Sequence, residues 1–174
     1  SHVVVATGGR VGQLEVEIAP DAVAVLTPTQ VLDDLAAVPQ GPVLVWDPIG
    51  GPVGVGIAEL LVAAGRETHI ATPDQIIGNE LARAGGLGPA NARLAQAGVI
   101  AHRRSILRSV GADGATLEDR FSGAAVVLDV ASVVDAGQRL PDDELWYEVH
   151  PLAGGRAVQV GDSVAAGTVL GEMA

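Results

Sequence analysis

The apolar residues of the chain gather in short runs, and these runs alternate with segments in which apolar positions recur at helical spacing. Residues 43–47 form a strongly apolar run that predicts a buried strand, and residues 67–71 predict the next strand. Between them, apolar residues recur with a helical period, and Gly65 follows as a typical helix end. The apolar positions of this helix are Val53, Ile57, Leu60, Leu61 and Ala64. A strand, a glycine-rich loop, a helix and a second strand within about 30 residues constitute a βαβ unit.

Similar patterns predict elements along the rest of the chain. Strands are predicted at residues 3–7, 99–102, 105–110, 115–117, 124–128, 132–137 and 157–160, and helices at 27–37, at 79–97 and from 161 onward. Residues 11–28 look irregular because Pro20 and Pro28 interrupt them. Turns at 111–114 and 122–123 indicate that the three strands between residues 105 and 128 are antiparallel. We therefore expect the α/β class: a Rossmann-like three-layer fold with a central parallel sheet, helices on one face and an antiparallel β-meander on the other.

The composition narrows the classes of function. The 174 residues carry 10 Lys and Arg against 21 Asp and Glu, which gives a net charge of −11. Such a chain is a poor match for nucleic acid or for an anionic membrane surface, because both are negatively charged. We expect neither as a partner. The absence of cysteine excludes disulfides, thiolate metal sites, iron–sulfur ligation and cysteine nucleophiles within these residues.

The sequence opens in the middle of a predicted strand, which is unusual for a natural N-terminus. Ser1 and His2 stand directly before an apolar run, without a methionine or a signal peptide. No run of about 18 uninterrupted apolar residues is present that would cross a membrane. We expect a fragment of a larger protein with a cytoplasmic location.

The glycine-rich loop after residues 43–47 is the feature that most indicates chemistry. In dinucleotide-binding folds, such glycines let the backbone approach a pyrophosphate at a helix N-terminus, where N–H groups and the helix dipole favour an anion. The pattern G-x-G-x-x-G is incomplete here, since Gly51 and Gly54 align with its second and third glycines and Ile49 takes the place of the first. Two interpretations stay open: a working phosphate cradle that includes Gly50, or a vestigial turn in which Gly54 serves close helix–strand packing.

The end of the second strand departs from the same pattern. An acidic residue there would bind the ribose hydroxyls of NAD, whereas this chain has Thr72 followed by proline. Three nearby arginines, Arg103, Arg104 and Arg108, would meet a 2′-phosphate if they reached this site. Otherwise they are solvated charges near a strand end.

Gly161 and Asp162 follow the last predicted strand and begin a short helix. Asp162 is interpreted either as a ligand of a ribose or ribitol hydroxyl or as a simple helix N-cap. The four histidines are scattered without i, i+4 partners, and no serine lies in a G-x-S-x-G elbow. We therefore predict no catalytic residue and no metal site in this chain.

Two distant segments of the chain are alike. Residues 4–10 and residues 133–139 each contain a valine-rich strand, a glycine, and an arginine two positions after that glycine. Either any two valine-rich strands would match in this way, or each copy closes one of two related nucleotide-binding lobes.

An ordered series of motifs covers nearly the whole chain. It consists of VVVATG at 3–8, LTPTQVLDD at 26–34, VLVWD with the glycine loop and GIAELL at 43–61, THIATP at 68–73, LARAG at 81–85, LAQAGVIAHRRS at 94–105, RLPDDELW at 139–146 and VQVGDS at 158–163. This order resembles the C-terminal half of the trimethylamine dehydrogenase and 2,4-dienoyl-CoA reductase group, within the old yellow enzyme-like NADH:flavin oxidoreductases.

The resemblance implies a parent enzyme of three parts. A TIM barrel would hold FMN and a 4Fe-4S cluster, and two nucleotide-binding-like lobes would follow, one for FAD or ADP and the other NAD(P)H-binding or its relic. Residues 29–136 would be the NAD(P)-binding-like Rossmann lobe, inserted into the other lobe. Residues 1–28 and 137–174 would be the remnants of that FAD/ADP lobe.

The residue patterns and the resemblance together give the candidate cofactor-binding residues. These are Gly50, Gly51, Gly54, Thr72, Gly137, Gly161 and Asp162. We expect NAD(P)H or no cofactor in the fragment, with FMN, FAD or ADP and the 4Fe-4S cluster confined to the full-length parent. The partner would be the rest of the parent chain, and a homo-oligomer stays open.

The expected function is that of a dinucleotide-binding-like fragment of a flavin- and iron–sulfur-dependent oxidoreductase, inactive by itself. One alternative is a non-catalytic structural or ADP-binding module of the same parent. The other alternative is an independent small NAD(P)-binding protein.

Overall fold

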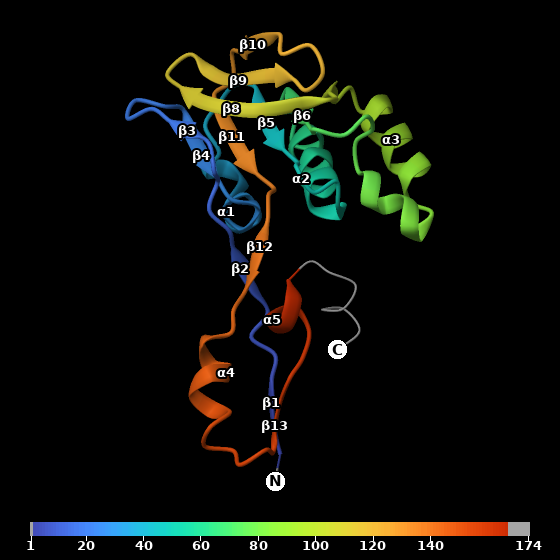
Figure 1. Ribbon diagram of the computed structural model, residues 1–174. Coiled ribbons are helices and arrows are strands. Elements are labelled where there is room, and N and C mark those ends of the chain that lie inside the picture. The colour runs from blue at the N-terminus through green and yellow to red at the C-terminus, as the bar shows by residue number, and fades with distance from the viewer. Residues whose placement is uncertain (1, 167–174) are drawn as a thin grey trace. The chain divides into compact units, whose positions relative to one another are not determined.

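The chain divides into two compact units, one of which is continuous in sequence while the other is formed by the two segments on either side of it. The computed structural model describes residues 2–166 (Figure 1). The larger unit comprises residues 14–137, and the smaller unit combines residues 1–13 with residues 138–174. The larger unit is therefore an insertion within the smaller one.

A five-stranded parallel sheet is the centre of the larger unit. Its strands, in spatial order, are β4 (Ala24–Leu26), β11 (Ser132–Asp135), β5 (Val43–Trp46), β6 (Thr68–Ala71) and β7 (Ile100–His102). Val43 pairs with Thr68 and Trp46 pairs with Ala71, so β5 and β6 are parallel neighbours as the sequence predicts. All four residues of β5 are buried, because this strand lies in the middle of the sheet.

Helices cover one face of this sheet. They are α1 (Pro28–Asp33), α2 (Pro52–Ala63) and α3 (Leu87–Gln96), with two 3-10 helices at η1 (Leu35–Ala37) and η2 (Asn79–Ala84). The side chains of Val45, Ile70 and Val134 point to this face and pack with Ile57 and Leu61 of α2. Burial of these apolar side chains holds the helices against the sheet.

An antiparallel meander covers the other face of the sheet (Figure 1). It is formed by β8 (Ser105–Gly111), β9 (Gly114–Asp119) and β10 (Ala125–Leu128), and the short β3 (Glu17–Ile18) is added beside β8. Leu44, Trp46 and Val133 of the parallel sheet pack there against Leu107 and Leu117 of the meander. The predicted fold class, a Rossmann-like three-layer α/β arrangement, is confirmed.

Several element boundaries differ from the prediction. Residues 11–28 are not irregular, since β4 lies in this segment and pairs with β11. The helix predicted at 27–37 is divided at Asp34, whose carboxylate accepts hydrogen bonds from the N–H groups of Ala36 and Ala37. The helix predicted at 79–97 is divided at Gly85, which has a φ of 71°. A left-handed residue cannot continue an α-helix.

The described residues of the smaller unit form two two-stranded sheets and two short helices. Parallel strands β1 (Val3–Val5) and β13 (Ala157–Gln159) form one sheet, and antiparallel strands β2 (Gly9–Val11) and β12 (Arg139–Pro141) form the other. The helices are α4 (Glu144–Val149) and α5 (Asp162–Ala165). Val3 and Val4 are 42% and 64% exposed, although the sequence predicts a buried strand there. Their exposure follows from the single neighbour, β13, that β1 has among the described residues.

The boundary between the units also differs from the predicted lobe boundary. The sequence places the start of the NAD(P)-like lobe at residue 29, whereas the larger unit begins at residue 14. Residues 14–28 belong with it because β4 extends the parallel sheet and β3 extends the meander. The nucleotide-binding origin of the two flanks stays a prediction.

Two glycines of α2 give a matched test of this packing. Gly54→Ala is expected to lower the free energy of unfolding by about 1–3 kcal/mol, because a Cβ at Gly54 would lie 2.5 Å from Cγ of the buried Asp47. Gly56→Ala is the control, since a Cβ there meets nothing within 4 Å. The control should be neutral or stabilising by up to about 1 kcal/mol. Denaturant unfolding measures both, and equal stabilities would contradict the packing described.

Candidate functional site

The turn between β5 and α2 contains three of the seven predicted site residues. Gly50 has a φ of 72°, a left-handed conformation that side chains disfavour. Gly51 is the N-cap of α2 and offers no capping side chain, and Pro52 is the first helical residue. Gly54 is buried within the first turn of the helix. The turn therefore has the backbone form of a glycine turn at a helix N-terminus.

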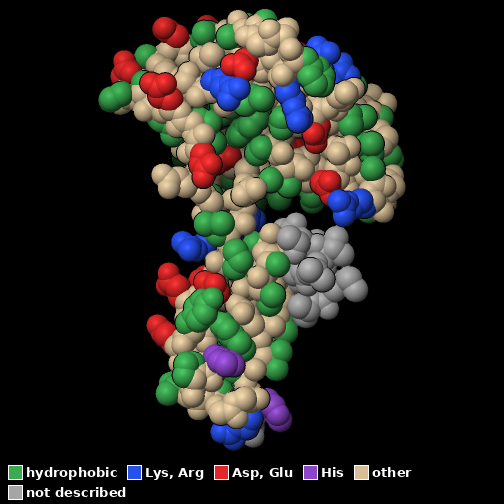
Figure 2. All heavy atoms as spheres, viewed as in Figure 1, with side chains coloured by type: hydrophobic (Ala, Val, Ile, Leu, Met, Phe, Trp, Pro, Cys, Tyr) green, Lys and Arg blue, Asp and Glu red, His purple; other side chains and the backbone are tan. Residues whose placement is uncertain are grey.

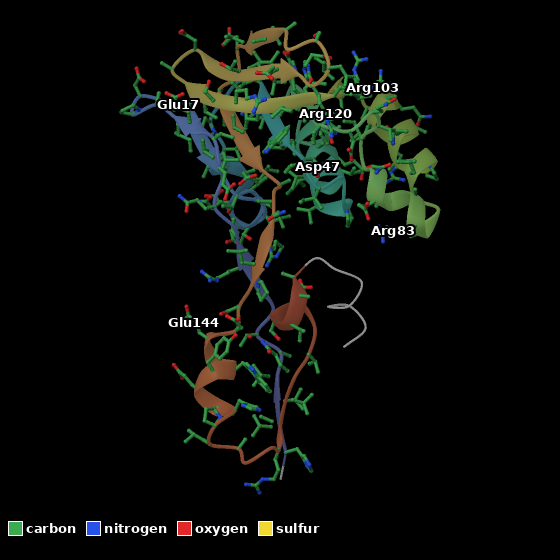
Figure 3. All side chains as sticks on the ribbon, viewed as in Figure 1. Glu17, Asp47, Arg83, Arg103, Arg120 and Glu144 are labelled. Carbon is green, nitrogen blue, oxygen red and sulfur yellow. The ribbon has the colours of Figure 1, made fainter. Side chains whose placement is uncertain are left out.

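Asp47 lies beneath this turn, and its side chain is buried (Figure 3). Its Oδ1 accepts a hydrogen bond of 2.9 Å from the N–H of Gly50. Its Oδ2 is buried without a hydrogen-bond partner. The same oxygen lies 2.8 Å from the position that a Cβ on Gly54 would take. A carboxylate of the chain itself thus fills the space between the strand end and the helix.

Burial raises the pKa of Asp47 from 3.8 to about 6. Removal of the carboxylate from water is the largest cause, and the nearby Asp74 raises the pKa further. The N–H groups of Gly50, Ile49 and Gly51 act in the opposite direction, because they stabilise the ionised form. The desolvation exceeds the stabilisation that these N–H groups supply.

The segment that follows β6 lies against the outside of the glycine turn. The N–H of Glu80 donates a 2.9 Å hydrogen bond to the carbonyl of Gly50, and a Cβ on Gly50 would lie 3.1 Å from the backbone nitrogen of Asn79. Ile77 of the same segment is buried in the core, and Asn91 of α3 donates a 2.8 Å hydrogen bond to its carbonyl. Besides Asp47, residues 79 and 80 therefore also pack against the turn.

Thr72 lies at the carboxyl end of β6, fully buried. Its hydroxyl accepts a 3.3 Å hydrogen bond from the N–H of Asp74, and its carbonyl accepts one of 2.8 Å from the N–H of Ser105. The threonine therefore closes the strand end locally. No carboxylate takes the place that a ribose-binding acid would occupy at residue 72.

Two arginines bind the segment after β6, Arg104 through its backbone N–H and Arg120 through its guanidinium. The N–H of Arg104 donates to the carbonyl of Asp74 at 2.8 Å, and Nη1 of Arg120 donates to the carbonyl of Pro73 at 3.3 Å. Arg103 is exposed, and its guanidinium forms no hydrogen bond or ion pair with the part of the chain that the structure describes. Figure 3 shows Arg103 and Arg120 at the same end of the meander.

Two of these arginines are paired with acids. The guanidinium of Arg104 lies 3.2 Å from Asp119, and that of Arg108 forms hydrogen bonds of 2.8 and 3.1 Å with Glu118. Figure 2 shows basic side chains interspersed with acidic ones on the visible face of the larger unit. Arg120 was not anticipated from the sequence, because only the pairing of β8 with β9 brings it to this point.

Gly137 follows β11, the strand beside β5. Its N–H donates a 2.9 Å hydrogen bond to the carboxylate of Asp135, and burial raises the pKa of that carboxyl. The N–H of Ala136 donates to the carbonyl of Trp46 at 2.9 Å, which holds this segment beside the end of β5. Two strand-end acids, Asp47 and Asp135, thus each bind a following glycine N–H.

Gly161 and Asp162 belong to the smaller unit. Gly161 is the N-cap of α5 with a φ of 71°, and Asp162 is the first helical residue. The other five predicted residues all belong to the larger unit and lie at the carboxyl ends of β5, β6 and β11. Ligands of parallel α/β sheets bind at this edge.

Strand pairing also joins two histidines that look unrelated in the sequence. Nδ1 of His69 lies 2.9 Å from Nε2 of His102, and the two rings stack at a centroid distance of 5.2 Å. Nε2 of His69 lies 3.4 Å from Glu67. Burial and the neighbouring His69 lower the pKa of His102. The parallel register of β6 and β7 places them together, and no local spacing signals it.

Two cavities of the described residues lie away from the glycine turn. A cavity of about 240 Å³ in the larger unit is lined by residues around the β8–β9 turn, such as Ser109 and Asp113. A second cavity, of about 280 Å³, belongs to the smaller unit and is lined by residues such as Val149 and Arg156. No helix of the described residues is long and apolar enough to cross a membrane.

Comparison with known proteins identifies the fold. No family model matches the sequence, and no curated protein matches it either. Among solved structures, the chain is similar to histamine dehydrogenase from Rhizobium sp. 4-9, with a TM-score of 0.84 and 19% identity. It is also similar to 6-hydroxypseudooxynicotine amine oxidase from Pseudomonas geniculata N1, with a TM-score of 0.83 and 22% identity. A third match is T. acidophilum thioredoxin reductase, with a TM-score of 0.72 and 12% identity.

The chain spans only part of each of these proteins. All three matches cover 97% of this chain, but they cover 28% of the dehydrogenase, 27% of the amine oxidase and 59% of the thioredoxin reductase. Similarity at these identities establishes the fold alone, shared over 97% of this chain.

The raised pKa of Asp47 predicts a measurable pH dependence of stability. An acid whose folded-state pKa is raised stabilises the fold at low pH, and this contribution is lost as the pH rises through about 6. The free energy of unfolding of Asp47→Asn, relative to that of wild type, should therefore rise by about 1–3 kcal/mol between pH 4 and pH 7. Denaturant unfolding across this range measures the difference. Asp113→Asn, which changes an exposed acid in the β8–β9 turn, is the control and should leave the pH dependence of the free energy of unfolding as in wild type. An equal change in both variants would contradict the prediction.

Proposed function

We propose that this chain is the C-terminal dinucleotide-binding-like region of a flavin- and iron–sulfur-dependent oxidoreductase of the trimethylamine dehydrogenase and 2,4-dienoyl-CoA reductase group. One observation carries the proposal: 97% of this chain superposes on 28% of a histamine dehydrogenase. The motif order in the sequence points independently to the same group. The flavin, the cluster and the substrate site would then belong to the rest of the parent polypeptide.

The smaller unit supports the idea that further polypeptide completes this fold. Parallel strands are normally buried on both faces within larger sheets, whereas β1 and β13 form a two-stranded parallel sheet. Hydrophobic side chains lie at the surface of this unit (Figure 2), and Val4 and Val158 of these strands are 64% and 51% exposed. Additional strands of an FAD/ADP lobe and the TIM barrel of the parent would cover them.

In this proposal the larger unit is the NAD(P)-like lobe and the smaller unit is the remnant of the FAD/ADP lobe. Gly50, Gly51, Gly54, Thr72 and Gly137 would line the cofactor edge of the first lobe, and Gly161 and Asp162 that of the second. The alternative of a non-catalytic structural lobe is favoured by one feature of the larger unit, the glycine turn that Asp47 and residues 78–80 cover.

The parent polypeptide tests the proposal directly. Purified from its native source with an antibody against this chain, it should show flavin absorbance and contain acid-labile sulfide in proportion to iron. A native polypeptide without either flavin or iron would contradict the proposal.

Titration with NADH, NADPH, ADP and FAD tests the cofactor role of the chain itself. We expect weak or no binding of NADH, because a lost hydrogen bond to ribose costs about 10- to 150-fold in affinity. NADPH should bind somewhat better, since the guanidinium of Arg120 lies at the end of β6 and Arg103 lies at the same end of the meander. A sub-micromolar dissociation constant for NADH would refute this expectation.

A double substitution tests whether these arginines cause the difference in affinity between NADPH and NADH. The variant that combines Arg103→Ala with Arg120→Ala should lose any preference for NADPH over NADH. Arg83→Ala is the matched control, because Arg83 is exposed on η2 and pairs with Glu80. Calorimetric titration of both proteins gives the comparison, and a preference that survives the double substitution would exclude these arginines.

A further inference from the structure

The glycine turn of the larger unit already holds an anion. In dinucleotide-binding folds, the N–H groups of this turn and the first turn of the helix face the pyrophosphate. Here the N–H of Gly50 donates to Oδ1 of Asp47 at 2.9 Å, and the N–H groups of Ile49 and Gly51 also stabilise that carboxylate. The acceptor at these N–H groups is thus a side chain of the same protein.

The second carboxylate oxygen points at the helix. Oδ2 of Asp47 is buried without a hydrogen-bond partner, 2.8 Å from where a Cβ on Gly54 would lie. The space beside Gly54 is therefore taken by the carboxylate of Asp47, and no room remains there for a ligand as well. In a dinucleotide fold, a glycine at this position allows close packing of helix and strand. Here it accommodates the side chain of Asp47.

Another segment of the chain packs against the turn as well. Glu80 donates its N–H to the carbonyl of Gly50, and the backbone nitrogen of Asn79 lies 3.1 Å from where a Cβ on Gly50 would be. Asp74 adds a second negative charge close enough to raise the pKa of Asp47. A pyrophosphate at this turn would meet two carboxylates and a backbone segment.

We propose that Asp47 is the resident anion of the glycine turn and the residue that makes this lobe reject a pyrophosphate. The inference rests on the proposed function in so far as that makes the larger unit a dinucleotide-binding-like lobe. It differs from loss of the first glycine or of the ribose-binding acid, because it assigns the rejection to a group that can be removed.

The test uses inorganic pyrophosphate as the probe and the backbone amide NMR signals of Gly50 and Gly51 as the readout. In wild type at pH 8, millimolar pyrophosphate should leave both signals unchanged. Asp47→Ser keeps a short acceptor for the Gly50 N–H and removes the second oxygen. This variant should show saturable shifts at both glycines, with affinity at least about tenfold above wild type.

Two further variants separate the charge from the space. Asp47→Asn removes the charge but fills the same volume, so it should gain much less affinity than Asp47→Ser. Asp135→Asn is the matched control, a neighbouring buried strand-end acid whose carboxylate binds the N–H of Gly137. It should behave as wild type.

Wild type alone can overturn the proposal, whether or not the variants fold. Saturable shifts of Gly50 and Gly51 in wild type would show that the turn is open to anions. A folded Asp47→Ser that stays silent would show that Asp47 does not hold the site. Neither result depends on finding flavin in the parent. The assay of the parent for flavin and iron therefore tests the proposed function independently of this inference.

Discussion

The parallel sheet of the larger unit has to be covered on both faces, and the rest of that unit follows from this requirement. Strand β5 is buried on both sides, with helices against Val45 and the meander against Leu44. Parallel sheets need such cover because their connections and side chains leave no face suited to water. The covering layers in turn deprive the strand ends of solvent. Asp47 and Asp135 therefore lie in surroundings where an ionised carboxylate is costly.

The elements with strong local signals could be predicted from the sequence. The apolar run at 43–47, the glycine turn and the helical period after it specify β5 and α2 closely. Strand β4 carries only three residues and lies between prolines, so its place depends on pairing with β11 rather than on its own pattern. The divided helices depend on single residues, Asp34 and Gly85, whose caps compete with the longer helical period.

The candidate site shows the same division between local and non-local information. A cluster of glycines after a strand indicates a turn by its composition alone, so Gly50, Gly51 and Gly54 could be identified directly from the sequence. The character of Asp47 depends on what lies above it, namely the first turn of α2 and the segment at 78–80, and a single strand-end Asp does not reveal that. Arg120 and the His69–His102 pair arise from strand register, which a one-dimensional pattern does not specify.

The insertion of one unit into the other has a consequence for the order of folding. Strands β1 and β13 pair Val3 with Ala157, so their sheet closes a loop of more than 150 residues. The entropic cost of closing a flexible loop grows with its length. Once residues 14–137 have folded, the N–H of Gly12 can reach the carbonyl of Gln138, and the two halves of the smaller unit are held together at short range. The inserted unit thus shortens the effective chain between the two halves of the smaller unit, and we expect its folding to precede that of the strands on either side.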